Sequence, residues 1–157
     1  MAATRNDLPD NCRKAMIALL NARLADAIDL RLAVKQAHWN VKGPSFIALH
    51  QMFDQIQGRI DGFVDEIAER GVTLGGVVDG TTQAAAKNTN LAPYPAGVTH
   101  QTEHLQALAD RVSAFGKLAR AAIDAADEAG DKDTADLFTG VSKQIDMDLW
   151  FIEAHLQ

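Results

Sequence analysis

A chain of 157 residues, 47% of them apolar, is long enough for one domain with a single sizeable hydrophobic core. The formal charge of −6 argues against a general nucleic-acid binder, which usually carries a basic surface, and favours attraction of cations. The lone Cys12 excludes an internal disulfide framework and a cysteine-rich metal site within one chain. There is no apolar run of roughly 20 residues and no signal-peptide pattern, so we expect a cytoplasmic protein with no membrane partner.

The apolar periodicity of the first half predicts two long helices. After a short N-terminal tail (residues 1–7), apolar side chains recur every three or four positions and predict a helix over 7–38. Gly43 and Pro44 interrupt this pattern, and Pro44 suits the first turn of a second helix that we expect over 44–72. The core face of this second helix is predicted to carry Leu49, Phe53, Ile56, Ile60, Phe63 and Ile67.

The second half of the chain adds a long connection and two more helices. The connection contains one short helix, expected over 81–87, before a long helix over 99–129. Either Asp131 or Asp133 can cap the last helix. Four long helices with one long crossover predict an all-α fold, a ferritin-like four-helix bundle with a short extra helix in the crossover. The whole chain, 1–157, is expected to form this single domain.

Two histidines and three carboxylates at helical spacings form the main candidate site: His38, His50, Asp54, Asp65 and Glu69. Imidazole and carboxylate together suit a hard transition metal such as iron. Because a helix turns by about 100° per residue, the last four of these residues share one sector of the second helix. That sector points well away from the core face, so the ligands do not face the bundle interior.

One copy of the second helix cannot bring its ligands around one ion. Asp54 and Asp65 are separated by about 16.5 Å along the helix axis, whereas metal–ligand bonds are about 2.0–2.6 Å long. His50 with Asp54, and Asp65 with Glu69, therefore form two half-sites. An antiparallel copy of the helix that crosses near 59–60 would set each half-site opposite the other, and a twofold axis creates this contact twice.

Small residues support this pairing of two subunits. Gly58 and Gly62 lie beside the expected crossing, where they would let two helices approach closely. His38, at the end of the first helix, could complete the half-site that carries His50. The alternative is an ordinary solvated surface, since Asp and Glu are mostly exposed in proteins. The shared sector and the glycines favour a composite metal site.

The sequence resembles the Dps family, the mini-ferritins that protect bacterial DNA during starvation. The resemblance rests on the motifs AHWNVKGPSF, LHQMFD, DEIAER and LGG, followed by TADLF and LWFIEAH near the C-terminus. These motifs occur in the family's order and spacing. The resemblance covers essentially the whole chain after the first few residues.

This resemblance implies a ferroxidase centre between twofold-related subunits. His38, His50 and Asp54 would come from one subunit, and Asp65 and Glu69 from the other. It also implies a hollow homododecamer that oxidises Fe(II), with hydrogen peroxide preferred over dioxygen, and stores Fe(III) as mineral. Consuming iron and peroxide together would protect DNA from oxidative damage.

The resemblance implies roles for four further residues. Trp39 could be a redox-active aromatic beside the iron, or an ordinary packed tryptophan. The acidic residues Asp127, Asp131 and Asp136 surround the last interhelical turn and could line threefold pores that admit Fe(II). Helix capping by Asp131 and simple solvent exposure of the other two are the alternatives.

DNA compaction within the nucleoid is the rival function, with iron chemistry as a secondary property. Family members that bind DNA often use a lysine-rich terminal tail. Here the first eleven residues contain one basic residue, Arg5, and the C-terminus ends without a basic tail. Because phosphate binding needs Lys or Arg to displace counterions, the sequence argues against direct DNA binding.

Overall fold

The computed structural model describes residues 1–157, which form five helices and no β-strand. In chain order the helices are α1 (Asp10–Asn40), α2 (Phe46–Thr73), α3 (Thr82–Asn88), α4 (Gln101–Ala129) and α5 (Lys132–Ala154). The all-α class and the short helix in the long connection are confirmed, and the predicted boundaries lie within three residues of the observed ones. The first helix begins later than predicted because Pro9 has an extended backbone (φ −56°, ψ 146°).

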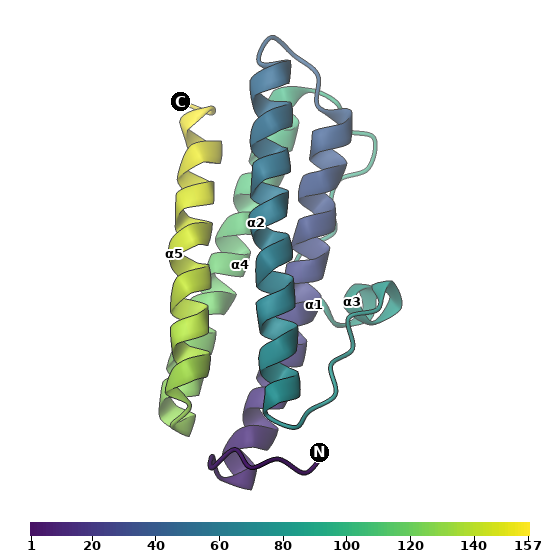
Figure 1. Cartoon of the computed structure of the whole chain (residues 1–157). Helices are drawn as coiled ribbons and strands as arrows, with labels where there is room; N and C mark the ends of the chain where they lie inside the picture. The colour runs from purple at the N-terminus through teal and green to yellow at the C-terminus, as the bar shows by residue number, and fades with distance from the viewer.

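The four long helices form two antiparallel hairpins, α1 with α2 and α4 with α5, which pack together as one bundle (Figure 1). The connection through α3 returns the chain to the end of the bundle where α2 began, so α2 and α4 run in the same direction. α3 itself packs against α1. None of these helices has both the length and the apolar character that crossing a bilayer requires.

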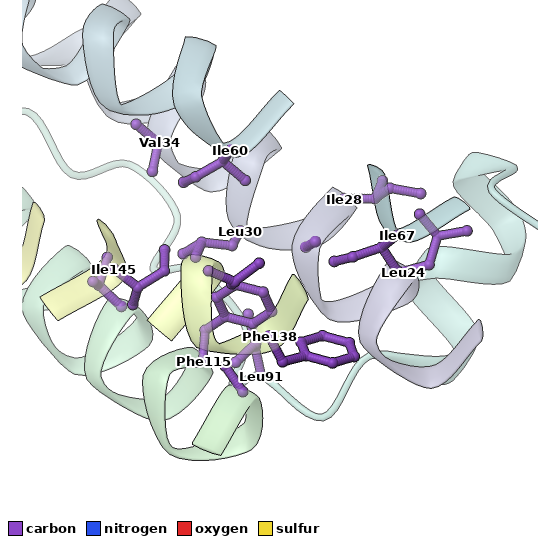
Figure 2. Close-up of a cluster of buried hydrophobic side chains, with 14 of the residues drawn as sticks. Leu24, Ile28, Leu30, Val34, Ile60, Ile67, Leu91, Phe115, Phe138 and Ile145 are labelled. Carbon is purple, nitrogen blue, oxygen red and sulfur yellow. The ribbon is translucent and has the colours of Figure 1, made fainter. Parts of the chain in front are cut away.

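The hydrophobic core runs along the bundle axis, and all four long helices contribute to it. Figure 2 shows part of this cluster, where side chains from α1, α2, α4 and α5 meet Leu91 of the connection. Five of the predicted core residues of α2 are completely buried, and Phe63 packs against the core while partly exposed. The exposed side of α2 therefore faces away from the rest of its own chain.

Two ion pairs tie α2 to the second hairpin. The Arg59 guanidinium donates to Oδ1 of the completely buried Asp148, at 2.6 Å from Nη2 and 3.0 Å from Nε. Arg70 donates to Asp131 at 2.7 Å. Burial raises the pKa of Asp148, while the hydrogen bond from Arg59 opposes that rise. These pairs fix the orientation of α2 about its own axis, and so fix which side chains it exposes.

We predict that Arg59→Met lowers the free energy of unfolding by about 2–4 kcal/mol, because it leaves the Asp148 carboxylate buried without a cation. Adding Asp148→Leu to this variant should restore most of the loss, since no buried charge then remains. Urea unfolding of the variants in one oligomeric state measures both effects. A double variant no more stable than Arg59→Met would contradict this account of the ion pair.

Candidate metal centre

The link between α1 and α2 is held rigidly against the start of α4. The backbone N–H of Lys42 donates to Thr99 at 2.8 Å, and that of Gln101 donates back to Lys42 at 2.9 Å. The Gln101 side chain accepts a hydrogen bond from the Ser45 N–H at 2.9 Å and fills the space beside Gly43. Gly43 has a φ of 145°, and a Cβ there would lie 2.5 Å from Oε1 of Gln101. The end of α1 and the start of α2 are thereby fixed relative to each other.

His38 and His50 face each other across this link. Nδ1–H of His38 donates to the His50 carbonyl at 2.7 Å, and Nδ1–H of His50 donates to the His38 carbonyl at 2.8 Å. The rings stack with centroids 3.7 Å apart. Because a carbonyl can only accept, each Nδ1 carries the proton when the ring is neutral. Each Nε2 then has a free lone pair, which is the arrangement of a metal-binding histidine held by a second hydrogen bond.

Asp54 lies one helical turn after His50, on the same side of α2. Its Oδ1 is 3.9 Å from Nδ1 of His38, and its side chain is about half exposed. The Lys35 ammonium donates a hydrogen bond to this carboxylate, which lowers the pKa of Asp54. With Gln51 and Gln55, these three predicted ligands line one shallow depression. A metal ion that binds Oδ1 of Asp54 would compete with Lys35 for that atom.

Asp65 and Glu69 are also exposed on α2 but lie apart from this depression. Asp65 borders a hollow beside the Arg31–Asp61 ion pair, and Glu69 borders another one near the end of the helix. No group of three or more His, Cys, Asp or Glu side chains in the single chain is arranged to hold a metal ion. The structure therefore gathers His38, His50 and Asp54, and leaves the other two predicted ligands on the open surface.

Gly58 and Gly62 lie between the two sets of ligands, and both are exposed. A Cβ added at either position would meet no atom of the chain within 4 Å. A glycine inside a helix costs about 1 kcal/mol relative to alanine. The packing of this chain gives no reason for that cost, whereas close approach of another helix does.

Trp39 and the three acidic residues of the predicted pore differ in how far they are exposed. Trp39 is 65% exposed, so it is not a packed core tryptophan within this chain. Asp131 is buried, pairs with Arg70 and accepts from the Thr134 N–H, an arrangement that favours the capping alternative over a pore-lining role. Asp127 and Asp136 are exposed, and Asp127 pairs with Lys132 at 2.7 Å.

Two features of the site region were not found from the sequence. Lys35 was overlooked as the partner of Asp54, although its position one turn before His38 on α1 could have indicated it. The buried His104 shares a hydrogen bond of 2.6 Å with the Tyr94 hydroxyl, which joins the long connection to α4. Burial lowers the pKa of His104 and raises that of Tyr94. No local pattern signals this pair, because the connection between its members is irregular.

Comparison with known proteins agrees with the fold. The ferritin family, as its ferritin-like domain, matches residues 17–157. A DNA protection during starvation protein from Agrobacterium fabrum is 48% identical over 154 residues, covering 98% of this chain and 95% of that protein.

Two solved structures extend the comparison. DpsC from Streptomyces coelicolor has a TM-score of 0.95 at 29% identity and covers 99% of this chain and 91% of its own. Dps from Microbacterium arborescens, in its high iron form, has a TM-score of 0.88 at 32% identity and covers 99% of both chains. The chain belongs to the Dps family of ferritin-like proteins, as its sequence motifs predict.

Proposed function

We propose that this protein oxidises Fe(II) and stores the Fe(III) product, and that each oxidation site is shared between two subunits. Membership of the Dps family supports iron storage and DNA protection in general terms. The observation that carries the more specific proposal is the paired orientation of His38 and His50. Their hydrogen bonds through Nδ1 leave both Nε2 atoms free to bind a metal, and Oδ1 of Asp54 lies 3.9 Å from Nδ1 of His38. This mixed donor set fits iron.

The ligands that this half-site lacks are available on a second copy of α2. The two half-sites lie at equal distances from a point between Arg59 and Ile60. An antiparallel copy crossing at that point places His50 opposite Glu69 of the partner subunit, and Asp54 opposite Asp65 of the partner subunit. The exposed glycines beside the crossing remove side chains that would hold the helices apart.

The charges around the composite site favour the oxidised ion. His38 and His50 bind Fe(II), the substrate, through neutral nitrogens, while carboxylates from both subunits stabilise the higher charge of Fe(III). Two Fe(II) ions give up two electrons, and hydrogen peroxide with two protons accepts them to form two water molecules. No hydroxyl radical forms in this balance. We infer that Trp39, which is exposed and next to His38 in the sequence, donates an electron to a stray one-electron oxidant.

Lys35 pairs with one of the proposed iron ligands, Asp54. Its ammonium neutralises Asp54 in the absence of iron, and its hydrogen bond keeps that carboxylate ionised and oriented. Fe(II) offers a higher charge at the same position. We therefore propose that iron displaces Lys35 from Asp54 on binding. The Fe(III) product would then pass to the interior of a homododecamer in the cytoplasm and mineralise there.

We predict that His50→Ala combined with Asp65→Ala slows Fe(II) oxidation at least about tenfold, because each composite site loses one ligand from each subunit. The measurement is anaerobic loading with Fe(II), addition of hydrogen peroxide and growth of ferric absorbance. Glu66→Ala is the matched control, since Glu66 is exposed on α2 outside the ligand sector. A double variant that matches the wild-type rate would reject the ferroxidase site.

Direct DNA binding is the competing proposal, and the charge distribution disfavours it. The side chains of the N-terminal tail, residues 1–7, carry no net charge, and the Ala2 N–H donates to the Gly75 carbonyl at 2.8 Å, so the tail is tied to the end of α2. Protection of DNA would then come from removing iron and peroxide. We predict that the protein leaves the migration of plasmid DNA unchanged in a gel-shift assay at low salt, where electrostatic binding is strongest. A retarded band that disappears with added salt would favour the DNA-binding function.

A further inference from the structure

The exposed side of α2 carries large apolar side chains as well as the proposed iron ligands. Ile47 near the start of α2 is 61% exposed, and Val72 near its end is 54% exposed. At about 100° per residue, the two lie within about 20° of each other around the helix, and within about 20° of Asp54 and Asp65. The exposed side of α2 that carries Ile47, the proposed ligands and Val72 is called the stripe. Ile47 lies beyond one end of the ligand set, and Val72 lies beyond the other. Each exposes apolar area that a second helix lying along this side of α2 would cover.

Ile47 and Val72 are also symmetric about the point between Arg59 and Ile60. This is the same point about which the two iron half-sites are symmetric. An antiparallel copy of α2 in the register that completes the iron site therefore places Ile47 opposite Val72 of the partner subunit. Packing within the chain does not explain the coincidence, because both side chains point away from the core.

The surface around Val72 is shaped to receive an aliphatic side chain. Ala68, Val72 and Val78 line an open hollow there, together with Thr73 and Glu69. This wall is mostly apolar, and its one charged member is a proposed iron ligand. An isoleucine seated in the hollow would lie beside Glu69 and limit its movement.

Charge repulsion between the proposed ligands gives such an apolar contact a role before iron arrives. The antiparallel register brings Asp54 close to Asp65 of the partner subunit, and like charges at short range oppose association. Lys35 and Arg31 offset part of this repulsion through their ion pairs with Asp54 and Asp61. Apolar burial at both ends of the stripe is unaffected by the repulsion between the carboxylates, so it can hold the helices in register.

We propose that Ile47 of each subunit seats in the hollow formed by Ala68, Val72 and Val78 of its twofold partner. The two equivalent contacts fix the register of the α2 helices and hold Glu69 of the partner subunit near His50. This inference rests on the proposed sharing of iron sites across a twofold axis, and it names the side chains that align the two halves.

Disulfide trapping tests the contact directly. The full-length double variant Ile47→Cys/Val72→Cys should form covalent dimers on mild oxidation, because the two new thiols face each other across the axis. Each single variant should remain monomeric on a denaturing gel, since two copies of the same position lie about 37 Å apart. Mixing the two single variants after subunit exchange should restore linked dimers. The native Cys12 is buried and should not contribute.

The matched control is Ile47→Cys/Glu66→Cys, which places an exposed thiol on α2 outside the stripe. Absence of linking in the Ile47→Cys/Val72→Cys protein, or equal linking in the control, would overturn the inference. Circular dichroism should show the same helix content in all variants, because the substituted side chains are exposed.

Fe(II) oxidation by the same proteins separates this inference from the proposed function. Linked dimers that have intact ligands but no ferroxidase activity would support the apolar contact and contradict the shared iron site. Activity without linking would support the iron site and contradict the contact. Linking with retained activity supports both.

Discussion

An α-helix advances about 1.5 Å per residue, and this rise separates Asp54 from Asp65 by about 16.5 Å on a single rigid rod. The core packing and the Arg59–Asp148 pair fix the helix, so bending cannot close the distance. One chain can therefore offer iron only half of its ligands at either end of the stripe. We therefore propose a site shared between two subunits, which makes dimerisation a condition for the chemistry.

The same constraint gives a physical reason for features that are costly in an isolated chain. Gly58 and Gly62 weaken α2 without easing any internal contact, and Ile47 and Val72 expose apolar surface. Each feature becomes favourable once a second α2 lies across the stripe. In the proposed function, the Lys35–Asp54 pair keeps the carboxylate neutralised and ordered until iron binds. We therefore propose that the stripe serves two partners, a second subunit and a cation.

Most of the fold could be predicted from the sequence, because it depends on strong local signals. Apolar periodicity located every long helix, and the length of the connection implied the parallel run of α2 and α4. Along α2, the rise per residue was enough to predict that His50 and Asp54 lie too far from Asp65 and Glu69 to bind the same ion. The sequence could not reveal contacts that cross the interhelical link, such as the reciprocal hydrogen bonds of His38 and His50. The environment of Asp131 could not be predicted either, because its ion-pair partner, Arg70, is far away in the sequence.

Sharing of the iron site between subunits is the central claim, and complementation between two defective chains measures it most directly. His50→Ala and Asp65→Ala should each lose most of the Fe(II) oxidation rate when alone. A mixed dimer contains one site that lacks both residues and one site with every ligand intact. After equimolar mixing and random exchange of subunits, Fe(II) oxidation by hydrogen peroxide should therefore recover to roughly a quarter of the wild-type rate. A mixture that stays as inactive as its components would contradict a site built from two subunits.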